Sequence, residues 1–231
     1  MHTHKEQSAG RDVVLRQSPG MLPWLERLPE LRRLTVADSA VRFTDKREWG
    51  INPRLFQRFD VDYTREDLKA FIRDCITPHL DGTGEADRLV INVRRGDYYS
   101  VPEFRAVYGM NIEGYIESAL EKAGPAESVL VVSDDPAWCQ EKLRVSGNVE
   151  YAEPGAWENF NAVATAHRLI GTNSSFSYWG GYVADTTNPG AQIIMPRFHK
   201  RSINGGNADQ LDPSWHVINT VPGGWRELHG N

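Results

Sequence analysis

The chain has 231 residues, enough for one large hydrophobic core or two small ones, and its 40% hydrophobic and 25% charged residues are typical of a globular protein. Its net charge of −5 argues against nucleic acid as a partner, so any site for an anion must be local. Two cysteines are too few for a disulfide framework or a thiolate metal site, which favours a reducing compartment.

The sequence contains no stretch that approaches the roughly 18 apolar residues of a membrane span. Its first residues also lack the apolar segment of a signal peptide. We therefore expect a protein without an integral membrane segment, located in the cytoplasm, with peripheral association with a membrane as the alternative. The sequence leaves the oligomeric state open.

The N-terminal part of the chain gives few periodic signals. Residues 1–20 are predicted to form a flexible lead-in. Residues 21–36 carry leucines at helix-like spacings that are interrupted by Pro29, which predicts two short helices or one kinked helix. Residues 37–63 have no clear period, and we interpret their large apolar residues as packing anchors. These are Phe43, Trp49, Leu55, Phe56 and Phe59.

A helix start follows at Thr64, which is suited to the N-cap position and precedes acidic residues. The apolar spacing beyond it predicts a helix near 65–77, ended by Pro78. The polar, glycine-bearing stretch 81–87 is the best internal boundary of the chain.

From residue 88 onward, strand and helix patterns alternate. This alternation predicts an α/β fold with a parallel sheet. Strands are predicted over 88–94, 128–133, 149–151, 169–172 and 192–195, and helices over 111–123, 136–145, 158–168 and 175–184. Residues 202–225 are expected to cover the edge of the sheet as a tail.

Two adjacent arginines, Arg94 and Arg95, stand at the end of the first of these strands. A guanidinium presents a planar fork of donors that suits carboxylate or phosphate oxygens. In an open parallel sheet, ligands bind outside the carboxyl ends of the strands. The pair therefore predicts a phosphate site at this edge.

Two further loops are expected at the same edge. In Ser133-Asp134-Asp135, the pattern favours Asp135 as a helix cap, while Asp134 either accepts N–H groups from a guanine base or lies in a solvated turn. In Thr172-Asn173-Ser174-Ser175, the serines either cap the next helix or donate to an anion at its N-terminus. Together with the arginines, these loops predict a pocket for a nucleoside diphosphate.

The same three segments resemble a known family. Arg94-Arg95-Gly96-Asp97-Tyr98, then Val132-Ser133-Asp134-Asp135 with Trp138, and then the stretch from Asn173 to Gly180 are similar in order and spacing to motifs of the α-1,2-fucosyltransferases, glycosyltransferase family 11. The likeness runs from about Asp60 to Trp225.

The resemblance implies a GT-B-like glycosyltransferase. Residues 85–231 would form a Rossmann-like lobe that binds the GDP-sugar and carries a C-terminal tail, and residues 21–84 a reduced, mostly helical part of the N-terminal lobe. The family's Gly-Gly-Leu-Gly-Asn-Gln segment has no counterpart in residues 1–80.

The resemblance also assigns roles to single residues. Arg94 and Arg95 would offset the charge that develops as GDP leaves, and Asp97 would brace them. Asn92 stands where the family commonly has histidine, and its amide can hydrogen-bond a nucleotide but cannot carry a proton. The implied donor-binding residues are Asn92, Arg94, Arg95, Asp134, Asp135, Asn173, Ser174, Ser175 and Phe176.

The implied reaction moves L-fucose from GDP-fucose, with inversion, to a saccharide hydroxyl, the 2-hydroxyl of a galactoside. No metal or other cofactor is expected. Related α-1,6-fucosyltransferases have a glutamate near the position of Glu103, so this residue is a candidate general base; it is otherwise a surface residue, and Asp97 is the other candidate.

Two other functions stay open. The missing glycine-rich segment favours a module that binds GDP or a nucleotide sugar without transfer, or an inactive relative. Asp134 and Asp135 would suit a Mg²⁺ or Mn²⁺ ion in a metal-dependent transferase, although the following Pro136 favours a helix start. His167 is expected to be a partly buried structural residue, and His199 to lie with Lys200 and Arg201 in a solvated loop.

Overall fold

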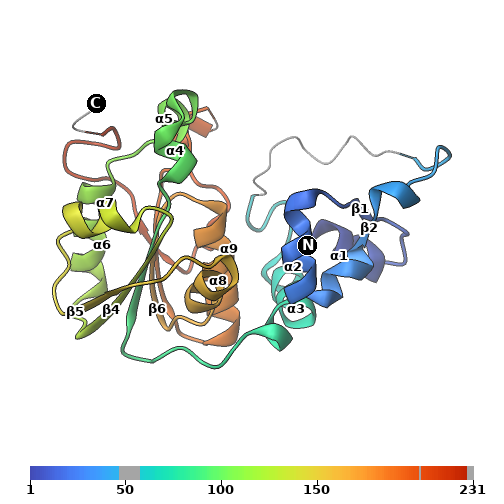
Figure 1. The fold of residues 1–231 in the computed structure, drawn as a ribbon, viewed down its shortest axis with the longest axis horizontal. Coiled ribbons are helices and arrows are strands. Elements are labelled where there is room, and N and C mark those ends of the chain that lie inside the picture. The colour runs from blue at the N-terminus through green and yellow to red at the C-terminus, as the bar shows by residue number, and fades with distance from the viewer. Residues whose placement is uncertain (47–57, 203, 228–231) are drawn as a thin grey trace. The chain divides into compact units, whose positions relative to one another are not determined.

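The computed structural model of the protein describes residues 1–46, 58–202 and 204–227. The chain forms two compact units, Met1–Leu80 and Asp81–Asn231. Each unit is described by itself (Figure 1).

The first unit consists of short elements. Its helices are α1 (His2–Ser8), α2 (Leu22–Arg27) and α3 (Arg65–Cys75), with 3-10 turns η1 (Pro19–Met21), η2 (Pro29–Leu34), η3 (Asp38–Ala40) and η4 (Thr77–His79) and a two-stranded parallel ribbon of β1 (Leu15–Arg16) and β2 (Thr35–Val36). Of the two predicted forms, two short helices or one kinked helix, the structure has the first, with helix α2 before Pro29 and the 3-10 helix η2 from Pro29 onward. Thr64 caps α3 as predicted, and its hydroxyl and the Asp67 carboxylate each accept the other's backbone N–H.

Two expectations for this unit were wrong. The lead-in contains helix α1, because His4 is buried, its ring forms a T-shaped pair with that of Phe71, and its Nε2 lies 2.9 Å from the Asp74 carboxylate. Among the expected anchors, Phe59 is buried but Phe43 is fully exposed. Trp49, Leu55 and Phe56 lie outside the described residues.

The second unit is built on a six-stranded, entirely parallel sheet, which confirms the predicted class. The strands are β3 (Leu89–Val93), β4 (Ser128–Ser133), β5 (Asn148–Tyr151), β6 (Arg168–Gly171), β7 (Gln192–Pro196) and β8 (His216–Ile218), and their order is β5-β4-β3-β6-β7-β8. This is the order of a Rossmann fold, in which the winding reverses between the first and fourth strands. Here the reversal falls between β3 and β6.

Helices cover both faces of this sheet (Figure 1). Helices α6 (Ile112–Ala123) and α7 (Pro136–Lys142) lie on one face, and α8 (Ala156–Ala164) and α9 (Ser175–Thr187) on the other. Because both faces are covered, all five residues of β3 are buried.

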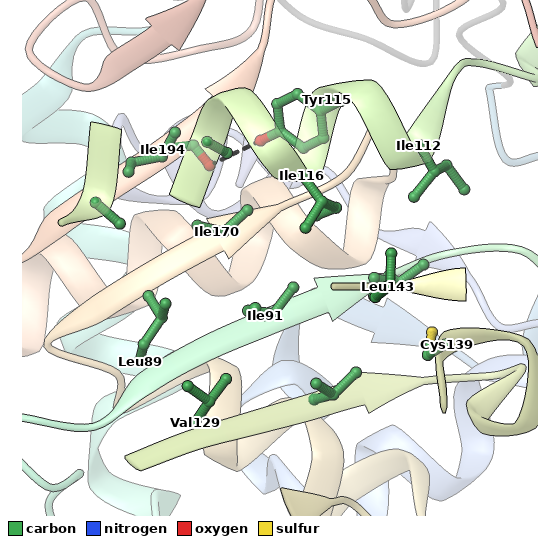
Figure 2. Close-up of a cluster of buried hydrophobic side chains, with 14 of the residues drawn as sticks. Leu89, Ile91, Ile112, Tyr115, Ile116, Val129, Cys139, Leu143, Ile170 and Ile194 are labelled. Carbon is green, nitrogen blue, oxygen red and sulfur yellow. Dashed lines mark hydrogen bonds between the residues drawn. The ribbon is translucent and has the colours of Figure 1, made fainter. Parts of the chain in front are cut away.

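A hydrophobic core lies under α6 and α7 (Figure 2). Leu89, Ile91 and Val93 alternate along β3 toward this face and pack with residues of α6 and α7. Tyr115 of α6 is fully buried there, and its hydroxyl donates to the carbonyls of Gly171 (2.6 Å) and Ile194 (3.2 Å). These bonds satisfy the phenol and tie α6 to the end of β6 and the middle of β7.

Several elements differ from the prediction. The loop expected after the arginines contains two short helices, α4 (Gly96–Ser100) and α5 (Pro102–Tyr108). The expected C-terminal tail includes β8, which pairs in parallel with β7 and extends the sheet. Helix α8 ends at Ala164 rather than near 168, because Arg168 already belongs to β6.

Candidate functional site

The carboxyl ends of β3, β4 and β6 carry the three loops that the sequence singled out. The backbone N–H of Arg94, after β3, donates to the Thr172 hydroxyl, after β6, at 2.9 Å. The backbone N–H of Arg95 donates to the Asp134 carboxylate, after β4, at 2.7 Å. The structure therefore brings the three loops together beside the reversal point of the sheet, where ligands of such folds bind.

Arg94 lies at this edge with its side chain 37% exposed. One guanidinium nitrogen, Nη2, lies 2.5 Å from the Asp97 carboxylate, and the other, Nη1, lies 2.7 Å from the Asp134 carboxylate. Its Cζ atom lies 5.4 Å from the centre of the Tyr98 ring. Arg94 is therefore held by two carboxylates while its side chain is still partly exposed.

Arg95 occupies a different environment. Its side chain is only 17% exposed, and its Cζ atom lies 4.2 Å from the ring centre of Tyr99 and 4.1 Å from that of Trp138. Its Nε donates to the Asp135 carboxylate at 3.0 Å. Such close stacking on aromatic rings suits arginine well. The two guanidiniums thus contact different carboxylates and different rings.

The formal charge of this cluster is slightly negative. Two arginines face three aspartates, Asp97, Asp134 and Asp135, which sums to −1. Asp135 also caps α7, as predicted, because its Oδ1 accepts the backbone N–H of Trp138 at 3.2 Å. An incoming diphosphate would compete with carboxylates that are already in place.

The loop after β6 is neutral and mostly buried. The Ser174 hydroxyl accepts the backbone N–H of Ser177 at 3.1 Å, which confirms it as the N-cap of α9. Asn173 is buried, and its amide donates to the carbonyls of Tyr108 and His199, both at 2.8 Å. Ser175 is exposed beside these residues at the start of α9.

The remaining predicted residues lie in three settings. Asn92 is buried, and its amide bonds to Ser177 and Val132. Phe176 is half-buried, and its ring forms a T-shaped pair with that of Phe160. Glu103 is exposed in the first turn of α5, and among the described residues no hydrogen bond or ion pair joins it to the arginines. The catalytic and binding roles of all these residues remain predictions.

His199 was misjudged from the sequence. It is 3% exposed, and its ring lies against those of Tyr108 and Tyr178 at 6.3 and 6.4 Å between centres. Burial, and to a lesser extent the neighbouring Lys200, lower the pKa of His199 to about 4, so the imidazole is neutral at pH 7. His199 follows β7 and so lies at the same edge of the sheet as the three loops. This position in the chain was the sequence signal that could have identified His199 as a residue near the site.

His167, by contrast, is half-buried as expected, and it lies just before β6 at the opposite edge of the sheet.

A groove of about 780 Å³ opens beside Arg95. It is lined by Tyr99, Asn111, Trp138, Lys142 and Glu227 among others.

Two features are absent from the described residues, a metal-binding cluster and a membrane-spanning helix. No group of three or more histidine, cysteine, aspartate or glutamate side chains there is arranged to hold a metal ion. Within the same residues, every helix is too short or too polar to cross a membrane.

Comparison with known proteins gives a consistent result. The model of glycosyl transferase family 11 matches residues 49–219. Galactoside alpha-(1,2)-fucosyltransferase 2 of Mus musculus is 29% identical over 143 residues, which cover 58% of this chain and 40% of the relative.

Two other relatives match similarly. Galactoside 2-alpha-L-fucosyltransferase Sec1 of Mus musculus is 28% identical over 142 residues, covering 58% of this chain and 38% of the relative. Galactoside alpha-(1,2)-fucosyltransferase 1 of Homo sapiens is 29% identical over 133 residues, covering 53% and 36%. The chain thus spans about two fifths of the length of these relatives. No solved structure matches it significantly.

Proposed function

Because the chain belongs to glycosyl transferase family 11, we propose that it transfers L-fucose from GDP-fucose, with inversion, to the 2-hydroxyl of a galactoside. The observation that carries this proposal is the position of the arginine loop, residues 94–99. Arg94 follows the central strand at the reversal point of a Rossmann-like sheet, opposite the exposed Ser175 at the N-terminus of α9.

In this proposal, Arg94 exchanges part of its contact with Asp97 and Asp134 for phosphate oxygens of the donor. Its partly exposed side chain supports this role, since exposed ion pairs are weak and readily replaced. The negative charge that grows on the phosphate as the glycosidic bond breaks would then be stabilised by a cation already in position. Asp97 would hold Arg94 in place, and Asp134, once displaced, would be available to a guanine base.

The unit Asp81–Asn231 would be the donor-binding lobe of a GT-B-like enzyme, and Met1–Leu80 a reduced N-terminal lobe. No divalent ion is required in this scheme. Asp134 and Asp135 both accept hydrogen bonds from the arginine loop, which supports an arginine-based rather than a metal-based leaving-group site.

Glu103 is the better candidate for the base that removes the proton of the acceptor hydroxyl. It is exposed, whereas Asp97 is engaged with Arg94. The Asp97 carboxylate already contacts the Arg94 guanidinium, which suits it to bracing Arg94. A positioned base of this kind contributes about 10²–10⁴-fold to the rate.

The test is GDP release from GDP-fucose, measured with and without a galactoside acceptor in the presence of EDTA. We expect release that depends on the acceptor and survives EDTA. Loss of release with EDTA would point to a metal at Asp134 and Asp135. The product should carry fucose on the 2-hydroxyl with the anomeric configuration inverted.

A second candidate function is a module that binds GDP without transferring the sugar. It is favoured by the carboxylates that already neutralise both arginines. This function predicts that GDP raises the melting temperature by mass action while no acceptor produces release. A protein that GDP fails to stabilise at any concentration would contradict both functions.

A further inference from the structure

We propose that Asn92 and Ser177 form a buried positioning pair that holds the three loops of the donor site in register. Neither side chain would touch the donor. This inference rests on the proposed donor site. It adds Ser177 to the residues that shape that site, and it gives Asn92 a new role.

Asn92 is a polar residue in an otherwise apolar strand, Leu89-Val90-Ile91-Asn92-Val93, and it is only 5% exposed. A buried amide is costly unless its polar atoms are hydrogen-bonded. Both ends of this amide have partners. Its Oδ1 accepts the Ser177 hydroxyl at 2.6 Å, and its Nδ2 donates to the Val132 carbonyl at 3.2 Å.

These partners lie in the elements next to the other two loops of the site. Val132 lies in β4, two residues before Asp134. Ser177 lies in the first turn of α9, where its backbone N–H donates to Ser174 and the two hydroxyl oxygens are 3.2 Å apart. Asn92 lies in β3, and Arg94 follows it by two residues, just after the strand ends. One side chain thus links the segments that carry Arg94, Asp134 and the start of α9.

The surroundings leave little room for another arrangement. Ser177 is completely buried, and a Cβ atom added at Gly171 would lie 2.9 Å from the Cβ of Ser177. Helix α9 therefore approaches β6 closely at this point. A water molecule that replaced the Ser177 hydroxyl would need space that this packing does not provide.

Burial also decides the kind of role. With exposures of 5% and 0%, Asn92 and Ser177 are not accessible to a nucleotide in this structure. A buried hydrogen bond adds little net stability but is directional, so its main effect is on where its partners lie. The pair accordingly acts on the donor through the positions of the loops.

A double-mutant cycle tests this proposal. Ser177→Ala, Asn92→Ala and the double variant are compared with the wild type for both GDP affinity and unfolding free energy. We expect Ser177→Ala to weaken GDP binding about 5- to 10-fold, the size expected for one hydrogen bond. The double variant should lose little more affinity than Asn92→Ala, because both substitutions break the same link.

Ser118→Ala is the matched control, since its hydroxyl donates to the Gly114 carbonyl within α6, away from the site. It should leave GDP affinity within about 2-fold of the wild type. Ser177→Ala removes a single oxygen and adds no atoms, so it keeps the test decisive if Asn92→Ala does not fold.

Unchanged GDP affinity in a folded Ser177→Ala protein, with only a lower stability, would overturn the positioning role. Strictly additive losses of affinity in the cycle would overturn the pairing. A wild type that does not bind GDP would instead remove the proposed function on which the inference rests, so the two failures are distinguishable.

Discussion

Two loops of the candidate site are held in opposite ways. The arginine loop, residues 94–99, is charged and partly exposed, and ion pairs with Asp134 and Asp135 fix it to the end of β4. The hydroxyl loop, residues 172–177, is neutral, and Thr172, Asn173, Ser174 and Ser177 are buried and hydrogen-bonded.

The difference indicates which loop can respond to a ligand. Ion pairs between partly exposed side chains contribute about 0–1 kcal/mol each, so an incoming anion can replace them at small cost. Hydrogen bonds in a dry interior are costly to leave unmade. We therefore expect the arginine loop to exchange partners on donor binding and the hydroxyl loop to act as a fixed frame.

The largest expected effect comes from removing the exchangeable cation. Arg94→Gln should weaken GDP binding about 10- to 100-fold, since a charge-assisted bond to phosphate contributes about 1.5–3 kcal/mol. Isothermal titration calorimetry of the variant measures this loss. Arg88→Gln is the control, because Arg88 flanks the other end of β3 and pairs with Glu85 and Glu150. Equal losses in the two variants would contradict a specific role for Arg94.

An intermediate effect concerns His199, whose carbonyl accepts a hydrogen bond from Asn173 of the hydroxyl loop. Its pKa of about 4 in the folded state lies below the ordinary value of 6.5, so the unfolded chain binds the proton first. The free energy of unfolding should therefore fall as the pH drops from about 6.5 toward 4, by at most about 1.4 kcal/mol per pH unit.

Denaturant titrations between pH 4.5 and 7.5 test this slope. His199→Gln should flatten it, whereas His216→Gln, at an exposed position of β8, should leave it as in the wild type. If His199→Gln keeps the full slope, other groups cause the pH dependence.

The smallest effects separate the two loops by their response to salt. Asp135→Ala and Ser174→Ala each remove an N-cap and should each lower the unfolding free energy by about 1 kcal/mol. Salt should reduce the loss for Asp135, because its ion pair with Arg95 is screened, but not the loss for Ser174.

Asp135→Asn serves as the control, since asparagine can still cap the helix but carries no charge. It should show only the salt-dependent part of the Asp135→Ala effect. Identical salt responses for Asp135→Ala and Ser174→Ala would show that charge does not distinguish the loops.

The sequence by itself determined the class of the larger unit and its family. The β-branched run at 128–133 forms β4 over those residues, and Asp135 and Ser174 cap the helices that they were predicted to cap. These features depend on neighbouring residues, so local patterns can predict them. The motifs around Arg94, Asp134 and Ser174 indicated the family that the comparison then identified.

Only the tertiary structure decided how the site is assembled. Strand β8 is three residues long and is stabilised by pairing with β7, and the burial of His199 depends on rings from α5 and α9. The separate environments of Arg94 and Arg95 are set by Asp134, Asp135 and Trp138, some forty residues further along the chain. Such contacts join residues that are distant in sequence, so the local pattern around each residue could not predict them.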